Sequence, residues 1–298
     1  MRAVVRRALH SNTATISLSA DVAVGALIRP APLLRQIDSA MWLSGGGNRL
    51  AAGGEAADAF CVAASIRLAP SIAAAGLPRT VFSMPPSDPS LRIFTWLSEV
   101  GGSSVTFGSA VASESSEVFA TTQRKFVRVA SNGRPANWSA EQRATLEAEC
   151  EADAIEASQL LARLHPDLFA CSADNSNALP ELLRLSVPDR GDGESESPPG
   201  RLLKTTVLPH NFGCAGHLDH ASLFEWVHDA YVLSNGGEHH PKTFTACINY
   251  FGPCAKYPKP PAMGDELEVI VMHGGADYVV RKVEDGMVPA VARVLAVA

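Results

Sequence analysis

An internal repeat constrains this chain more than any other feature of its sequence. The segment from Leu33 to Gly47 (LLRQIDSAMWLSGGG) aligns without gaps with the segment from Leu223 to Gly237 (LFEWVHDAYVLSNGG), at a constant offset of 190 residues. Both segments carry apolar residues at helical spacing, and both end in glycine, which commonly follows a helix. Two unrelated amphipathic helices would be the alternative explanation. We interpret the match as two copies of one unit, each built around a buried helix.

The residues around each predicted helix indicate the same order of elements in both copies. In the first copy, residues 3–20 have an extended pattern, and Pro30 and Pro32 suit a helix start because proline is tolerated in the first turn. Short runs rich in β-branched and aromatic residues follow between residues 60 and 130, and similar runs flank the second helix between residues 202 and 298. This pattern predicts an α+β fold in which an antiparallel sheet wraps around a central helix in each copy.

A helical segment and an acidic linker separate the two copies. Ser139 and Gln142 form a capping-box pattern at the start of a helix that is predicted to continue to His165. Residues 187–200 (VPDRGDGESESPPG) have the composition of a flexible linker. We therefore divide the chain into an N-terminal domain (residues 1–138), a helix with a flexible acidic linker (139–200) and a C-terminal domain (201–298).

Composition and charge argue against several classes of function. The chain has 25 Lys and Arg against 31 Asp and Glu, a net charge of −6, so no nucleic-acid partner is expected. No apolar run approaches the roughly 18–20 residues that a membrane span requires. The six cysteines form no CxxC pair, which favours reduced thiols and a cytoplasmic location. The start of the chain is basic and lacks acidic residues, so a mitochondrial or plastid location is the alternative, although a first strand explains the same segment.

The segment GHLDHASLFEW, from Gly216 to Trp226, resembles the G-H-V-N-N-A-x-Y-L-x-W signature of hot-dog-fold thioesterases of the 4-hydroxybenzoyl-CoA thioesterase type. Residues 249–253 (NYFGP) and 264–267 (GDEL) resemble the strand and turn that follow in that family. The resemblance covers most of residues 200–298 and extends loosely to residues 1–140. It implies a tandem (double) hot-dog, which is a pseudo-dimer in one chain that could assemble into a further homo-oligomer.

The resemblance implies an acyl thioester hydrolase that needs no cofactor and uses acyl-CoA or acyl-carrier protein as its substrate. One departure from the family weakens this expectation. The aspartate that usually stands three residues before the motif glycine is replaced by Gly213. A non-catalytic acyl-binding pseudo-dimer is therefore one alternative. A hot-dog hydratase or dehydratase is another, although the usual aspartate–histidine pair of that group is missing.

Hydrolysis of a thioester needs a polarised carbonyl group and an activated water molecule. The start of the second buried helix offers backbone N–H groups, and Gly213 and Gly216 would let the backbone approach the substrate closely. In a pseudo-dimer the two helices lie antiparallel, so this turn can face the other helix. The preferred site therefore combines Asn211 and His217 from the turn with Asp38 from the first copy.

The repeat also suggests a second, weaker site. Asp21 lies opposite Asn211 in the alignment, and it could act with His228 or Asp229 of the second helix. Asp21 and Asn211 could equally cap a turn or a helix. Six of the nine histidines lie between His210 and His240, yet none of their spacings matches a zinc signature, so no metal is expected.

Overall fold

The computed structural model describes thirteen segments of the chain. They are residues 10–14, 23–24, 27–28, 30–43, 58–69, 91–112, 117–130, 134–164, 200–212, 218–235, 243–250, 260–272 and 276–297. Within these segments no helix combines the length and the apolar character that crossing a membrane would require.

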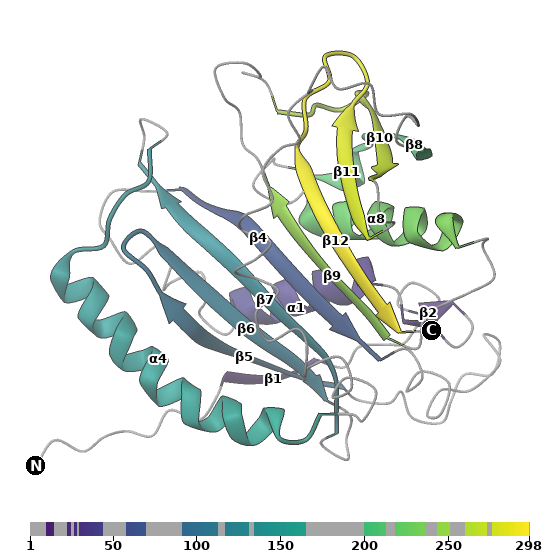
Figure 1. The fold of residues 1–298 in the computed structure, drawn as a ribbon. Coiled ribbons are helices and arrows are strands. Elements are labelled where there is room, and N and C mark those ends of the chain that lie inside the picture. Colours follow the sequence, from purple (N-terminus) through teal and green to yellow (C-terminus); the bar gives the residue numbers. More distant parts are fainter. Residues whose placement is uncertain are drawn as a thin grey trace, which may run out of the picture.

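One antiparallel sheet of ten strands passes through both halves of the described structure (Figure 1). Its spatial order is β1-β5-β6-β7-β4-β9-β12-β11-β10-β8. The strands are β1 (His10–Ala14), β4 (Asp58–Leu68), β5 (Leu91–Val100), β6 (Ser104–Ala112), β7 (Val118–Val129), β8 (Arg201–Thr206), β9 (Thr243–Tyr250), β10 (Glu266–Val271), β11 (Asp277–Lys282) and β12 (Ala290–Val297). Two short strands, β2 (Ala23–Val24) and β3 (Leu27–Ile28), form a separate hairpin.

The two halves of the sheet have the same topology. From the outer edge to the centre, the first half has the order β1, β5, β6, β7, β4 and the second half has the order β8, β10, β11, β12, β9. When the five strands of each half are numbered along the chain, both orders read 1, 3, 4, 5, 2. The two second strands, β4 and β9, meet at the centre, where residues 63–68 pair with residues 244–249 in antiparallel register. The two halves are therefore related by a pseudo-two-fold arrangement.

The two long helices on the sheet correspond to the repeat. Helix α1 is Pro30–Leu43 and helix α8 is His220–Ser234, so the offset of 190 residues carries the first residue of α1 onto the first residue of α8. Both helices pack on the same face of the sheet and share one hydrophobic core, in which Leu34, Ile37 and Phe224 are fully buried. The predicted α+β order, with a helix against each half of the sheet, is confirmed.

The third long helix, α4 (Ala140–Leu161), lies beside the open edge of β5 (Figure 1). Its predicted capping box is present, since the side chain of Ser139 accepts from the backbone N–H of Gln142 at 3.2 Å. Strand β1 pairs with β5 only up to Thr95. Beyond that point Asp153 of α4, which is buried, accepts a hydrogen bond from the backbone N–H of Leu97 at 2.9 Å. The helix thus covers a sheet edge that would otherwise expose unpaired backbone groups.

Alternation along β7 determines which side chains face the helices. From Thr122 onward every second residue of the strand is buried, and these positions include Arg124 and Phe126. Phe126 packs edge to face against Phe107 of β6, with ring centroids 5.9 Å apart. Because alternate residues of a strand share a face, the charged side chain of Arg124 lies on the same face as the aromatic side chain of Phe126.

The packing of Trp96 against Gly108 yields a test of the sheet. These residues pair across β5 and β6, and a Cβ atom at Gly108 would lie 2.3–2.5 Å from the indole ring. We expect Gly108→Ala to lower the free energy of unfolding by about 1–3 kcal/mol, because the ring must leave its place. Chemical denaturation would measure the change. Gly102→Ala is the control, since its nearest neighbour would lie 3.7 Å away; equal stability of the two variants would contradict this packing argument.

Candidate active site

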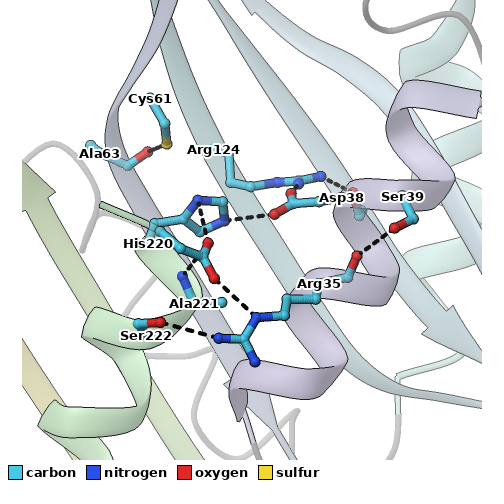
Figure 2. Close-up of polar contacts among 11 residues, drawn as sticks. Arg35, Asp38, Ser39, Cys61, Ala63, Arg124, His220, Ala221 and Ser222 are labelled. Atoms are coloured by element: carbon cyan, nitrogen blue, oxygen red, sulfur yellow. Dashed lines mark hydrogen bonds and ion pairs between the residues drawn. The ribbon is translucent and has the colours of Figure 1, made fainter. Parts of the chain in front are cut away.

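Charged side chains from both halves meet where the middle of α1 faces the start of α8 (Figure 2). Arg35 and Asp38 come from α1, Arg124 from β7, and Asp219 and His220 from the start of α8. We call these five residues the inter-helix cluster. The cluster exists only because the two halves pack together, since no single half supplies all of its members.

Asp38 lies at the centre of the inter-helix cluster. One of its carboxylate oxygens contacts the guanidinium group of Arg124 directly, and the other lies 3.0 Å from Nε2 of His220. The side chain of Arg124 is fully buried, whereas those of Asp38 and His220 are 20% and 15% exposed. The carboxylate therefore bridges a buried cation and an imidazole that solvent can still reach.

His220 is uncharged at neutral pH. The pKa of its imidazole is lowered from 6.5 to about 4, chiefly by burial; the carboxylate of Asp219 opposes this shift, and the nearby cations Arg124 and Arg35 contribute to it. A neutral imidazole has one nitrogen that accepts a proton and one that donates. One ring nitrogen of His220 is therefore an acceptor at physiological pH.

Asp219 and Arg35 form a second layer around the imidazole. Asp219 is the N-cap of α8, where its Oδ1 accepts from the backbone N–H of Ala221 at 3.1 Å. Its other oxygen accepts from Nε of Arg35 at 3.0 Å, and Nη2 of Arg35 donates to Ser222 Oγ at 3.1 Å. At least one of the backbone N–H groups at the start of α8, that of Ala221, is thus already bonded to a carboxylate.

Asn211 is joined to the inter-helix cluster through Ser222. It ends the short 3₁₀ helix η1 (Pro209–Asn211) and is buried. Its Oδ1 accepts from the backbone N–H of Leu208 at 2.8 Å, and its Nδ2 donates to Ser222 Oγ at 3.1 Å. These bonds anchor the turn before α8 to the helix. Asn211 and Arg35 thus share Ser222 as a hydrogen-bond partner, and the predicted catalytic pairing of Asn211 with Asp38 stays a prediction.

The other predicted site residues are distributed as follows. His228 lies two turns along α8 from His220, roughly 12 Å in axial rise, and its Nδ1 is 3.8 Å from Oδ1 of the half-exposed Asp229. Four predicted residues lie outside the described parts of the chain, so their roles stay predictions: Asp21, Gly213, Gly216 and His217.

The pseudo-two-fold axis relates the inter-helix cluster to a second end, at the start of α1. There the side chain of Glu225 accepts from the backbone N–H of Ala31 at 3.3 Å. The repeat offset pairs Glu225 with Arg35 and pairs Ala31 with Ala221, so each helix sends one charged side chain to the start of the other. At this second end the position of His220 is occupied by Pro30, which has no side chain able to accept a proton.

Three members of the cluster could approach a metal ion. Asp38, Asp219 and His220 offer ligand atoms that all lie within 4.8 Å of one another. However, Arg124 contacts one carboxylate and Arg35 contacts the other, so two cations already neutralise the two acids. A divalent ion would have to displace these guanidinium groups, and the donor set therefore does not favour a metal site.

Sequence reasoning did not select His220 or Arg124 as site residues. His220 stood among several histidines at the start of the second helix, and no pattern in the sequence distinguished it. A signal for Arg124 was present, because strand alternation places it on the same face as the apolar Phe126. An arginine among inward-facing residues indicates a buried partner of opposite charge.

Solved structures of two acyl-ACP thioesterases resemble the whole chain. The protein from Bacteroides thetaiotaomicron VPI-5482 matches with a TM-score of 0.58 and 12% identity over 96% of this chain and 95% of its own. The 12:0-ACP thioesterase from Umbellularia californica matches with a TM-score of 0.58 and 13% identity over 95% of each chain. No protein-family model and no curated protein matches the sequence.

This likeness confirms the predicted double hot-dog fold, because it extends over both halves of the chain. At 12–13% identity it establishes the fold and not the activity. The finer resemblance to the 4-hydroxybenzoyl-CoA thioesterase type stays a prediction.

The buried imidazole predicts a specific dependence of stability on pH. His220 titrates near pH 4 in the folded chain and near 6.5 when unfolded, so between these values the unfolded state binds more protons. Its contribution to stability is complete above pH 6.5 and is lost as the pH falls towards about 4, a loss on the order of a few kcal/mol. Denaturation of the wild type and His220→Gln across pH 4–7 would measure it. The same pH dependence in both proteins would contradict the assignment.

Proposed function

We propose that this chain is an acyl thioester hydrolase acting on acyl-CoA or acyl-carrier-protein thioesters. The observation that carries the proposal is the position of the Asp38 carboxylate, 3.0 Å from the ring of His220 at the start of α8. A neutral imidazole beside a carboxylate is suited to remove a proton from water. The fold supports the same chemistry, since solved proteins described as acyl-ACP thioesterases share it over nearly the whole chain.

In the proposed reaction His220 acts as the general base. It accepts a proton from a water molecule while the water oxygen bonds to the carbonyl carbon of the thioester. Asp38 stabilises the imidazolium that forms. When the resulting tetrahedral intermediate collapses, the carbon–sulfur bond breaks, and His220 returns the proton to the departing sulfur. The products are a carboxylic acid and a free thiol, and the enzyme regains its starting protonation state.

The carbonyl oxygen needs a positive group as its negative charge develops. The N–H group of Ala221 already donates to Asp219, so the start of α8 offers fewer hydrogen-bond donors to the carbonyl oxygen than an uncapped helix would. We assign this role to Arg35, because 44% of its side chain is exposed beside the imidazole. The backbone around Gly213 and Gly216 is a second source of donors proposed from the sequence.

Substitutions at the two central residues test the proposal. We expect His220→Gln to lower kcat by roughly 10²–10⁴-fold, because the general base is lost. Asp38→Asn should lower kcat as well, since the imidazolium loses its counter-charge. Thiol release from acyl-CoAs of increasing chain length, and from acyl-carrier protein, would measure both effects.

The matched control is His210→Gln, because His210 is exposed on η1. Its turnover should equal that of the wild type. Circular dichroism must show that all three variants remain folded. Full activity of His220→Gln would contradict the assignment of the base, and the absence of turnover with every acyl group would leave an acyl-binding protein. A hydrated acyl product in place of free thiol would indicate a hydratase.

The presence of Pro30 at the position of His220 predicts one substrate site per chain. Pro30 stands where the repeat requires His220, and Glu225 occupies the backbone N–H of Ala31. We therefore expect a non-hydrolysable thioether analogue of an acyl-CoA to bind with a stoichiometry of one per chain. Isothermal titration calorimetry would measure this value, and a stoichiometry of two would show that the second end is also functional.

A further inference from the structure

Three buried hydroxyl groups lie side by side on the face of the sheet on which α1 packs. Thr95 of β5 pairs directly with Ser109 of β6, and Ser109 pairs directly with Thr122 of β7. Ile66 of β4 pairs with Thr122 on its other side and belongs to the core that α1 shares, so the three hydroxyls face that core. We call Thr95, Ser109 and Thr122 the hydroxyl row.

The second half of the sheet carries apolar residues on the corresponding strands. β10, β11 and β12 occupy the places that β5, β6 and β7 occupy in the first half. There Val269 pairs with Val280, and Val280 pairs with Ala290, within the core that α8 shares. The hydroxyl group of Tyr278, which belongs to the same core, meets Ser234 Oγ at 3.2 Å. Among the described residues, a row of three buried hydroxyls is therefore a feature of the first half.

Two hydroxyls of this row have bonding capacity that the described parts of the chain do not use. Oγ1 of Thr122 is buried and has no hydrogen-bond partner there. Oγ of Ser109 accepts from Nη2 of Arg124 at 3.1 Å, and no described residue accepts the proton of Ser109 in return. A buried hydroxyl without a partner costs free energy, which valine would avoid with the same shape. Ser109 and Thr122 are therefore suited to bind an oxygen atom from outside the chain.

Arg124 connects the hydroxyl row to the inter-helix cluster. It follows Thr122 by two residues on β7, so both side chains lie on one face of the strand. Its guanidinium group contacts the carboxylate of Asp38 (Figure 2) and also donates to Ser109 Oγ. The row therefore begins one guanidinium group away from Asp38, beside which the thioester is proposed to react.

We propose that Ser109 and Thr122 bind an oxygen atom on the acyl chain of the substrate. The inference rests on the proposed function and narrows its substrate class to thioesters whose acyl group carries a hydroxyl or keto oxygen close to the reacting carbonyl. Both side chains can donate to such an oxygen, which has two lone pairs. An unsubstituted acyl chain would place a methylene group against the same two hydroxyls and leave them unpaired.

Substrates of equal chain length isolate the effect of this oxygen. Thiol release would be measured for acyl-CoAs that are unsubstituted, that carry a β-hydroxyl or a β-keto group, or that carry a hydroxyl at the far end of the chain. A ratio of kcat/KM values compares two substrates on the same hydrolytic machinery. We expect the wild type to prefer a β-oxygenated substrate by roughly tenfold or more. The far-end hydroxyl should give no advantage, and the two β-oxygenated substrates show whether the oxygen is a hydroxyl or a keto group.

Thr122→Val is the decisive variant, because Oγ1 of Thr122 bonds to no described residue and valine keeps the shape of the side chain. We expect the preference for the β-oxygenated substrate to fall by roughly tenfold. Ser109→Ala should reduce the preference as well, and it should also lower the turnover of every substrate because it removes the bond to Arg124. Thr121→Val is the matched control: Thr121 faces the other side of the sheet, so its preference should equal that of the wild type.

The unfolding temperature is a second readout, and it does not depend on turnover. Without substrate, Thr122→Val should unfold at a higher temperature than the wild type, because a methyl group replaces a buried hydroxyl that has no partner among the described residues. A lower unfolding temperature would show that bound water or another group already satisfies this hydroxyl in the free protein, and it would overturn the inference.

Equal kcat/KM for the unsubstituted and the β-oxygenated substrates in the wild type would overturn the inference and leave the proposed hydrolase intact. An unchanged preference in Thr122→Val would overturn it as well. If no thioester is hydrolysed, the proposed function fails. Isothermal titration calorimetry with non-hydrolysable thioether analogues, with and without the β-oxygen, then decides whether the hydroxyl row selects its ligand.

Discussion

The backbone pairing of β4 with β9 is the interaction on which the rest of the structure depends. It joins two sheets of five strands into one, and it removes the one edge that each half would otherwise expose at the centre. It also places both helices on one face, where α1 and α8 share a core. Because the pairing is antiparallel, the helices run past each other in opposite senses, and the start of α8 faces the middle of α1. The inter-helix cluster is a consequence of this register.

The cluster illustrates how electrostatic cost restricts the choice of residues. Arg124 is buried, so it requires a counter-charge, and Asp38 on the facing helix supplies it. Arg35 and Asp219 form a second ion pair. His220 lies between the two acids, Asp38 and Asp219, and therefore lies next to both ion pairs. The two acids and two arginines cancel in net charge. Burial therefore remains the main influence on the imidazole, which stays neutral at physiological pH.

The sequence predicted the elements of this fold better than it predicted the contacts between them. The repeat located both α1 and α8, because two helices with the same apolar spacing and the same terminator are visible without tertiary information. Short runs rich in β-branched and aromatic residues located β5, β6 and β7, and the capping box located the start of α4. The boundaries proposed at residues 138 and 200 stay predictions. Asp38 was selected as an acidic residue in the middle of the first helix, whereas its contact with His220 depends on the packing of two segments that lie far apart in the chain.

The difference between the two ends of the helix pair follows from how each helix start is capped. At α8 the backbone N–H group of Ala221 donates to the side chain of the N-cap residue Asp219, which belongs to the same half. Arg35 of the other half then donates to the second carboxylate oxygen of Asp219. At α1 the donor of Ala31 is satisfied from the other half by Glu225, the counterpart of Arg35. The second end thus uses its cross-helix side chain for capping, with a proline where the first end has a histidine. Under the proposed function one end carries the chemistry, while the hydrogen bond from Ala31 to Glu225 joins the two halves at the other.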